Sequence, residues 1–349
     1  MIGNDSYTQI KRLIWRSGFF ALFLLAPVLD IFRFDLNKNH MIFLWHPWTL
    51  GIDSSKTGFE LVFDMFILFF LPLGLFLWIG FYVSWKWGRL YCGWLCPHFP
   101  VVEAINSLMR RASGKLSIWD KEKLPNEQMD GKRIEPNKMW WVVTIVVVIL
   151  ISFVWGAALL TYLLPPKEIY GNLLGGNLTR NQFIFIATTT LLFALEFTAA
   201  RHLFCRFGCA IGLLQSLIWM ANKKAMVVAF DRKSAKLCAD CDRSCEHACP
   251  MRLKPRSLKR SMFTCTQCMQ CVDACEKVQD KKSGAPLLKM LEEHCALDVS
   301  DRGFGRKPVV PERCFSSENT GKRHCACNQT QYVPVRERES VDNSKNALG

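Results

Sequence analysis

Acidic residues are scarce in this chain of 349 residues, where 30 Asp and Glu stand against 44 Lys and Arg and leave a net charge of +14. A basic balance occurs in nucleic-acid-binding proteins, but here most Lys and Arg flank apolar segments. The positive-inside rule and attraction to anionic lipid explain basic residues in such places. The charge pattern therefore predicts a lipid bilayer as a partner and no nucleic acid.

Charged residues of either sign are also sparse before about residue 222 and concentrate after it. Hydrophobic residues make up 50% of the chain, a share that is ordinary for a membrane protein. A helix needs about 20 apolar residues to cross a bilayer. Four runs approach that length, at residues 17–32, 61–83, 139–164 and 183–200. We therefore expect a membrane all-α domain of four transmembrane helices over residues 1–222.

The chain lacks the pattern of a cleavable signal, because Lys11, Arg12 and Arg16 precede an apolar run that has no small-residue cleavage site. The first run is therefore expected to be an uncleaved span. Residues 84–138 carry ten Lys and Arg, whereas residues 164–181 carry two. The positive-inside rule places the first of these segments in the cytoplasm. Both termini are then predicted to be cytoplasmic.

Eight of the 16 cysteines fall into two groups of four. They read C-A-D-C-D-R-S-C-E-H-A-C-P at residues 238–250 and C-T-Q-C-M-Q-C-V-D-A-C at residues 265–275. A 4Fe-4S cluster needs one thiolate per iron, and such short gaps let one loop meet three corners of the cube. Structural zinc, which takes two spaced pairs of ligands, is the competing interpretation, but it fits this spacing less well. Cluster ligands are reduced thiolates, so this segment should lie in a reducing compartment.

In two-cluster bacterial ferredoxins the fourth cysteine of each run serves the other cluster. The crossed rule predicts one set of Cys238, Cys241, Cys245 and Cys275, and a second set of Cys265, Cys268, Cys271 and Cys249. The first run departs from the usual pattern in having three residues between Cys241 and Cys245, and Glu276 rather than proline after Cys275. The extra residue should bulge one ligand loop. We expect a small α+β two-cluster ferredoxin-like domain over residues 223–288.

An internal repeat adds two C-x3-C pairs. R-L-Y-C-G-W-L-C-P at residues 89–97 parallels R-H-L-F-C-R-F-G-C at residues 201–209, and an amphipathic stretch follows each copy. Both copies follow spans that are predicted to cross in the same direction, so the membrane domain should be two repeated helical hairpins related by an axis along the membrane normal. Residues i and i+4 share a helix face. Four thiols should then converge at the cytoplasmic edge of the membrane: Cys92, Cys96, Cys205 and Cys209.

The simplest explanation of these four cysteines is that they are ordinary buried side chains. Their repeated spacing and the neighbouring Arg89, Arg201 and Arg206, which would favour thiolates, indicate a redox or metal site instead. The spacing does not identify the occupant. A third cluster, copper and a redox-active thiol pair all stay open.

The motif G-R-L-Y-C-G-W-L-C-P at residues 88–97, the pair Cys205 and Cys209, and the two-cluster segment resemble the membrane polyferredoxin family. The resemblance covers about residues 10–280, and the family has NapH-like quinol-dehydrogenase and CcoG-like oxidase-accessory branches. It implies a multi-pass protein of the bacterial inner membrane that exchanges electrons with quinone or a respiratory partner. For the oxidase-accessory branch it implies reduction of Cu(II) to Cu(I) during cofactor assembly, although this chain lacks that branch's long C-terminal β-sandwich extension.

Three hypotheses of function follow. The first is a membrane-anchored electron-transfer protein that relays electrons between the cytoplasmic 4Fe-4S clusters and the membrane-edge cysteines, to or from quinone or a respiratory partner. The second is a cupric reductase that delivers Cu(I) for oxidase maturation, in keeping with the preference of Cu(I) for thiolates. The third is a membrane-tethered redox sensor.

Residues 289–349 form a polar tail. It holds Cys295, Cys314, Cys325 and Cys327. Their irregular gaps favour spare thiols in a partly disordered segment over a further metal site with His294 and His324.

A few ionisable residues lie in or near the predicted spans. They are Asp30, Glu60, Asp64 and Glu196. Charges at such depth suggest proton or ion handling, although Glu196 could simply pair with Arg201 and the others could lie at the headgroups. His40 and His46 are candidates for contact with copper or quinone in an aromatic loop that could also serve only as an anchor.

Overall fold

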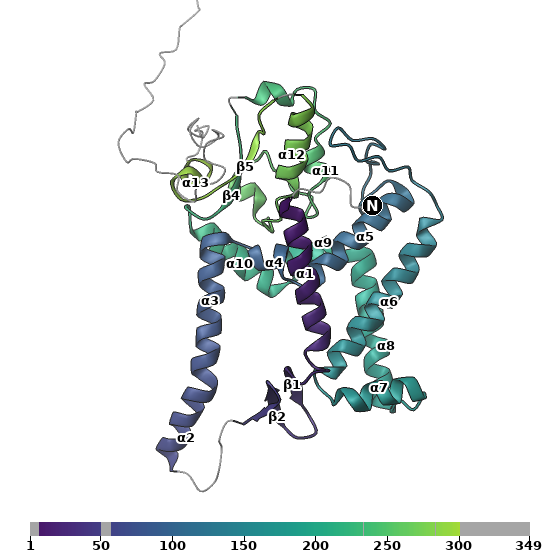
Figure 1. Ribbon diagram of the computed structural model, residues 1–349, viewed down its shortest axis with the longest axis vertical. Helices are drawn as coiled ribbons and strands as arrows, with labels where there is room; N and C mark the ends of the chain where they lie inside the picture. The colour runs from purple at the N-terminus through teal and green to yellow at the C-terminus, as the bar shows by residue number, and fades with distance from the viewer. Residues whose placement is uncertain (1–6, 50–56, 233, 283, 301–349) are drawn as a thin grey trace, which may run out of the picture.

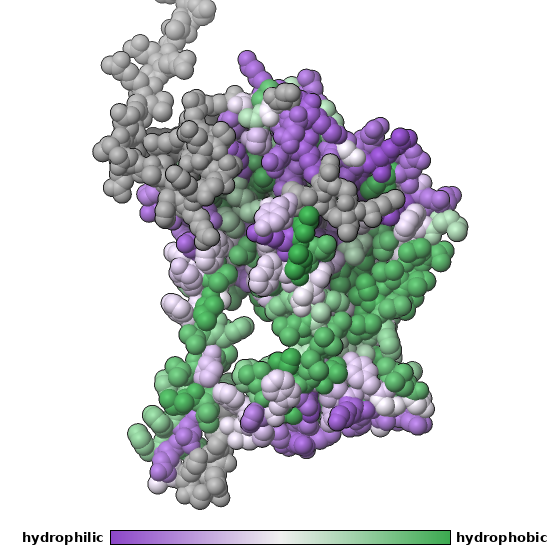
Figure 2. All heavy atoms as spheres, viewed as in Figure 1, coloured by the Kyte–Doolittle hydropathy of each residue, from purple (hydrophilic) through white to green (hydrophobic). Residues whose placement is uncertain are grey.

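The computed structural model describes residues 7–49, 57–232, 234–282 and 284–300. Figure 1 shows an elongated molecule with long helices in its middle, a small sheet and α7 at one end, and a second small α+β part at the other. In Figure 2 the long helices form an apolar belt between two hydrophilic ends. The chain is therefore mostly helical and has the surface of a membrane protein.

Three described helical segments are long and apolar enough to cross a membrane. Gly58–Trp87 has a mean hydropathy of 2.3, Trp140–Thr161 of 2.8 and Arg180–Gly208 of 1.8. The first joins α2 (Gly58–Met65) and α3 (Leu71–Trp87), the second is α6, and the third begins with α8 (Arg180–Leu195). They contain the second, third and fourth predicted spans.

The first predicted span, residues 17–32, is only partly helical. Helix α1 (Tyr7–Leu25) ends two residues before Pro27, in keeping with the clash between a proline ring and the helical turn before it. It is not among the three apolar helices, because its first half contains Lys11, Arg12 and Arg16. It nevertheless packs on α6, where the Phe23 and Trp155 ring centroids are 4.8 Å apart. The Tyr162 hydroxyl also donates a hydrogen bond of 2.7 Å to the Phe23 carbonyl oxygen. Four spans stay a prediction.

The sheet at the α2 end is antiparallel and has the strand order β1-β2-β3. Its strands are β1 (Phe32–Asp35), β2 (His40–Phe43) and β3 (His46–Trp48). Helix α7 (Pro166–Gly175) lies beside the sheet in Figure 1. Backbone N–H groups of Phe34 and Leu36 donate to the carbonyl oxygens of Tyr162 and Leu163, so the sheet is fixed to the end of α6.

Two C-x3-C pairs and two further helices form the layer between the membrane helices and the opposite end. Helix α4 (Leu90–Trp94) contains Cys92, and α5 (His98–Ser113) begins directly after the first pair. Helix α10 (Ala210–Ala221) begins directly after the second pair and packs against α3. The two stretches predicted to follow the pairs are therefore α5 and α10.

The part beyond this layer contains the two cysteine runs. Strand β4 (Val227–Phe230) pairs antiparallel with β5 (Leu288–Leu291). Helices α11 (Ser244–His247), α12 (Gln270–Lys281) and α13 (Glu293–Ser300) surround this ribbon. The predicted boundary at residue 289 falls inside β5. Cys295 of α13 is 1% exposed in the core, not in a disordered tail, while Cys314, Cys325 and Cys327 lie outside the described residues. A ferredoxin-like fold stays a prediction.

Candidate iron-sulfur sites and membrane-edge cysteines

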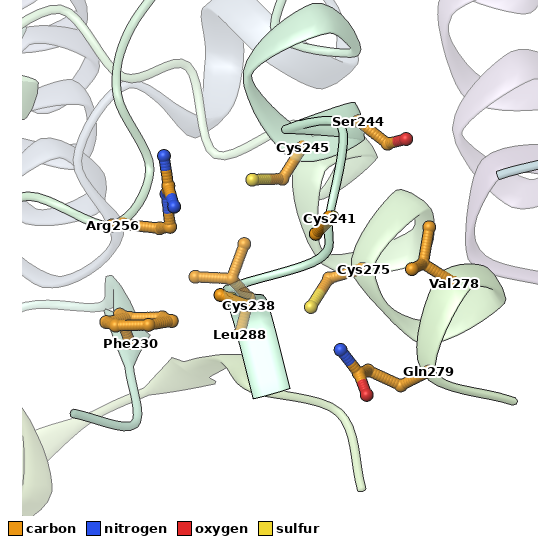
Figure 3. A pocket seen from close by; sticks show the side chains of 10 residues that line it. All are labelled: Phe230, Cys238, Cys241, Ser244, Cys245, Arg256, Cys275, Val278, Gln279 and Leu288. Atoms are coloured by element: carbon orange, nitrogen blue, oxygen red, sulfur yellow. The ribbon is translucent and has the colours of Figure 1, made fainter. Parts of the chain in front are cut away.

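Four cysteines line one cavity of about 300 Å³, open solvent at its mouth included. They are Cys238, Cys241, Cys245 and Cys275. Figure 3 shows the Cys245 and Cys275 side chains entering this cavity from α11 and α12, with Arg256 at its side. Burial raises the pKa of Cys245 to about 12, with Arg256 acting in the opposite direction. The cavity is thus a buried thiol site with one neighbouring cation.

The extra residue of the first run is accommodated by a local turn. The Asp242 side chain accepts a 3.0 Å hydrogen bond from the Ser244 N–H. Arg243 between them adopts a left-handed conformation with φ of 62°. An Asx turn with a left-handed central residue shortens the loop. The three residues between Cys241 and Cys245 therefore still return the chain to the cavity.

The other four cysteines line a second cavity of about 370 Å³, open solvent again included. They are Cys249, Cys265, Cys268 and Cys271. Gln267 and Met269 flank Cys268 with positive φ values of 55° and 61°, which fold the ligand loop tightly around the cavity. The Leu253 N–H donates to the Cys249 sulfur over 3.4 Å. Such N–H groups stabilise a thiolate in a cluster site.

Each cavity therefore takes three cysteines from one run and one from the other, as the crossed rule predicts. Among the described residues, no three His, Cys, Asp or Glu side chains are arranged to hold a single metal ion. Zinc needs its ligands gathered at one ion, whereas a 4Fe-4S cube spreads them over four corners. Two cavities that are each lined by four separated thiols suit a 4Fe-4S cube better than a zinc ion. Cluster binding by these eight residues stays a prediction.

The two C-x3-C pairs come together at the membrane edge. Cys92 and Cys205 are each 8% exposed. Burial raises the pKa of Tyr91 to about 12, and the charges of Cys96, Cys92 and Cys209 act in the same direction. Cys205 lies within electrostatic reach of Cys92 and Cys96. The Cys92 thiol donates a 3.2 Å hydrogen bond to the Gln215 Oε1 atom of α10.

Arg89 favours the thiolate of Cys92, in the expected direction, but burial acts more strongly against it. Burial raises the pKa of Cys96 to about 11. It also raises the pKa of Cys92, although the charge of Arg89 lowers it. The cost of burying a thiolate outweighs the arginine. These cysteines are therefore neutral thiols at pH 7 unless a bound metal displaces their protons.

Two arginine side chains are fully buried beside this site. Arg89 and Arg201 are each 1% exposed. Arg89 donates from Nη2 to the Cys205 carbonyl oxygen over 2.7 Å. Within the described part of the chain, none of the three guanidinium nitrogens of Arg201 has a hydrogen-bond partner. Asp120 and Glu196 lie within electrostatic reach of Arg201, so its buried charge has nearby carboxylates but no direct hydrogen bond in the described part of the chain.

Glu196 has a different neighbour from the one expected. Its Oε1 atom lies 3.3 Å from the His98 Nε2 atom, directly after the first C-x3-C pair. The His98 ring stacks on Phe197, with centroids 5.2 Å apart. The pairing expected with Arg201 is therefore replaced by a pair that joins α5 to the third apolar helix.

The other ionisable candidates have structural roles. Glu60 accepts a 3.0 Å hydrogen bond from the Thr57 N–H and caps α2. Arg33 is ion-paired with both Asp30 and Asp35. His46 is exposed on β3 and His40 is half-buried on β2, at the end of the molecule remote from the cysteines. None of these residues joins a cysteine site.

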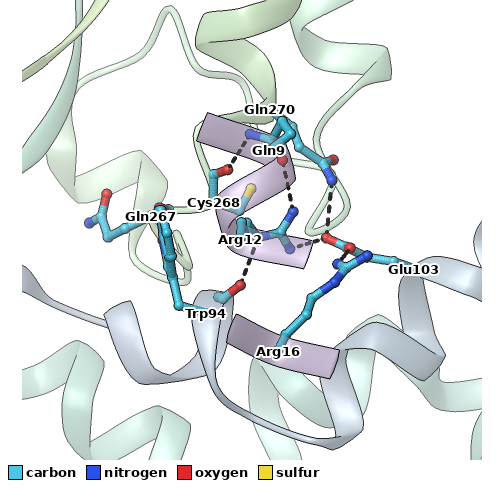
Figure 4. A network of polar contacts seen from close by, with 9 residues as sticks. Gln9, Arg12, Arg16, Trp94, Glu103, Gln267, Cys268 and Gln270 are labelled. Atoms are coloured by element: carbon cyan, nitrogen blue, oxygen red, sulfur yellow. Dashed lines mark hydrogen bonds and ion pairs between the residues drawn. The ribbon is translucent and has the colours of Figure 1, made fainter. Parts of the chain in front are cut away.

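The sequence did not reveal a polar network that ties α1 to the cysteine layer (Figure 4). Arg12 is ion-paired with Glu103 of α5 and donates a 2.7 Å hydrogen bond to the Gly93 carbonyl oxygen. Gln9 donates over 3.0 Å to the Cys268 carbonyl oxygen. Its local signal in the sequence is the basic half of α1, which by itself indicates only an uncleaved first span. The network holds the first C-x3-C pair against the second cavity.

These features define a membrane-associated iron-sulfur protein, and comparisons with known proteins agree. Residues 67–115, which contain Cys92 and Cys96, match the family model described as a 4Fe-4S binding domain. The chain is 24% identical to the ferredoxin-type protein NapH of Escherichia coli, over 54% of this chain and 60% of NapH. It is 24% identical to the nitrogen fixation protein FixG of Rhizobium meliloti, over 61% of this chain and 42% of FixG.

A further relative is an uncharacterized protein of Methanocaldococcus jannaschii, 28% identical over 54% of this chain and 70% of that protein. No solved structure matches the chain. The chain spans less than two thirds of both NapH and FixG. The matches confirm the resemblance to the membrane polyferredoxins and identify 4Fe-4S ferredoxin-type electron transfer as the general function.

Proposed function

We propose that the protein passes electrons along a row of three cysteine sites. The first is the cavity that contains Cys238, the second is the cavity that contains Cys265, and the third is the membrane-edge group of Cys92, Cys96, Cys205 and Cys209. Electrons leave or enter the row at its membrane end, to or from quinone or a respiratory partner. A 4Fe-4S cluster takes up and releases one electron without making or breaking covalent bonds. The task of the chain is then to space, bury and hydrogen-bond the centres.

One observation carries this proposal: the loop of the second cavity touches the first C-x3-C pair. The Trp94 indole N–H donates a 3.1 Å hydrogen bond to the Gln267 carbonyl oxygen. Arg89, which contacts the Cys205 carbonyl oxygen, also reaches the Thr264 carbonyl oxygen over 3.5 Å. Because these two sites are in contact, an electron has only a short distance to cross between them.

A third thiolate-ligated cluster is the occupant we propose for the membrane-edge group. Four cysteine ligands and an iron-sulfur core together carry net negative charge, and the buried Arg89 and Arg201 side chains would compensate it. The match of residues 67–115 to a 4Fe-4S binding domain covers half of this group. Cu(I) would suit the same soft ligands.

The proposed orientation places the two cavities in the cytoplasm of a bacterium. In Figure 1, helix α1 runs from the cysteine layer to β1. The three apolar helices run between the same two ends of the molecule. Its contacts with Trp155 and Tyr162 of the α6 region support a fourth span. Residues 84–138, with ten Lys and Arg, then face the cytoplasm with both cavities.

The test uses the full chain purified without oxygen and reduced with limiting dithionite. It is mixed with a short-chain quinone, or with a Cu(II) complex, while cluster absorbance is followed. We expect quinone to reoxidise the centres rapidly in the wild type and slowly in a Cys92→Ser, Cys96→Ser variant. Arg133→Met serves as the control because this exposed side chain lies outside all three sites. Rapid reoxidation by Cu(II) alone would favour the cupric reductase, and no reoxidation by either would reject both functions.

A further inference from the structure

The membrane layer and the loop of the second cavity approach each other closely at one glycine. Gly93 directly follows Cys92 in α4, and Thr266 directly follows Cys265 in the second cysteine run. A Cβ atom built on Gly93 would lie 2.1 Å from the Thr266 carbonyl oxygen. No side chain separates the two backbones. Gly93 is therefore required here for close approach and not for an unusual backbone conformation.

We propose that this contact is the route by which electrons cross between the second cavity and the membrane-edge cysteines, with Gly93 and Trp94 as its positioning residues. The inference rests on the proposed function. Electron tunnelling slows steeply as the gap between covalent paths widens. One covalent path runs from Cys92 to Gly93, and the other runs from Cys265 through Thr266 to its carbonyl oxygen. The backbones approach across a gap too narrow for a Cβ atom on Gly93.

Neighbouring hydrogen bonds hold the two segments in register. Trp94 donates to the Gln267 carbonyl oxygen over 3.1 Å. The Gly93 carbonyl oxygen accepts from Arg12 over 2.7 Å on its other side. The contact through Arg89 is longer, at 3.5 Å to Thr264, and runs through a whole side chain. The glycine contact is thus the shorter connection.

The step itself is a one-electron transfer. The centre held by one cysteine set loses one electron and is oxidised, and the centre held by the other gains it and is reduced. No covalent bond forms or breaks, and no proton is needed. The chain contributes the distance between the two centres.

Gly93→Ala tests the route. The added methyl group would meet a backbone oxygen and not the end of a flexible side chain, so the two segments have to separate. The matched control is Gly74→Ala in α3, where an added Cβ has nothing within 4 Å. Each full-length protein is purified without oxygen and reduced with substoichiometric dithionite. Freeze-quench EPR then follows the arrival of electrons at the membrane-edge centre.

We expect Gly93→Ala to keep its iron content and ferredoxin-type spectra while the arrival rate falls several-fold, because the two segments have to separate. Gly74→Ala should match the wild type. A wild-type rate in Gly93→Ala would overturn the inference and leave the proposed function intact. Absence of electron arrival in the wild type itself would instead reject the proposed function.

Trp94→Phe keeps the test decisive if Gly93→Ala fails to assemble its clusters. This variant removes only the indole N–H that holds the contact and retains an aromatic ring. A slower arrival rate at unchanged iron content would support the route. An unchanged rate would count against it, because the hydrogen bond to Gln267 would then have no part in electron transfer.

Discussion

The Nη2 atom of Arg89 donates a hydrogen bond of 2.7 Å to the carbonyl oxygen of Cys205. The two residues come from different copies of the internal repeat, so this bond ties the first C-x3-C pair to the second. A Cβ on Gly212 would lie 2.2 Å from the same nitrogen, so an alanine there would displace the guanidinium. The guanidinium is thus built into the centre of the membrane-edge group.

Arg89→Met should slow electron transfer to the membrane-edge cysteines by about 10- to 100-fold, the usual effect of losing an outer partner of a metal site. It removes a buried charge and leaves the carbonyl oxygens of Cys205 and Thr264 without this donor. Arg89→Lys should recover little, because an ammonium lacks the fork of the guanidinium. Freeze-quench EPR with iron analysis is the measurement. Arg133→Met, at an exposed side chain, is the control. Equal rates in Arg89→Met and the control would contradict the prediction.

The crossed ligand sets can be tested by counting iron. Cys249→Ala should cost about four iron atoms per chain, because one 4Fe-4S cluster loses a ligand. Adding Cys268→Ala should cost no more, since both residues line the same cavity. Adding Cys241→Ala instead should cost about four more. In an uncrossed arrangement, Cys249→Ala with Cys268→Ala would cost about eight iron atoms, and Cys249→Ala with Cys241→Ala about four. The iron content of the two double variants therefore distinguishes the two arrangements.

A buried ion pair and an exposed ion pair in this chain should contribute differently to the free energy of unfolding. Glu103→Gln leaves the buried Arg12 and the half-buried Arg16 without their shared carboxylate (Figure 4), and breaking a buried pair typically costs about 3–5 kcal/mol. Glu135→Gln breaks an exposed pair with Arg133, typically worth about 0–1 kcal/mol. Denaturant unfolding, followed by circular dichroism of the full chain, measures both. Similar losses in the two variants would show that the α1 network is not a tight link.

The grouping of the eight ferredoxin-type cysteines was predictable because ligand spacing is local. Positions such as Cys241 and Cys245 lie within one short loop, and the crossed fourth ligand follows a general rule. The α1 network was not predictable, because Gln9 and Cys268 are 259 residues apart and no periodic pattern joins them. The role of Gly93 was not predictable either, because the sequence does not show that Thr266 packs against this glycine. The raised pKa of Cys96 was not predictable either, because it comes from depth of burial, which the sequence does not show.

The number of spans gives the last prediction, because α1 decides on which side the β1–β2 turn lies. If α1 crosses the membrane, Asn39 at that turn faces away from the cytoplasm, and both the N-terminus and Lys121 face inward. A reporter that is active only outside the cytoplasm should then work when inserted after Asn39 and fail when inserted after Lys121. Both positions are exposed, so insertion should leave the fold intact.

A second reporter, fluorescent only in the cytoplasm, is fused to the N-terminus to separate three spans from four. Fluorescence there together with outside activity at Asn39 requires α1 to cross. If the N-terminus and Asn39 report the same side, α1 lies along the membrane surface. The basic half of α1 favours the first result, because Lys11, Arg12 and Arg16 resist translocation across the bilayer. Four spans would also put both cavities on the side where thiolates stay reduced.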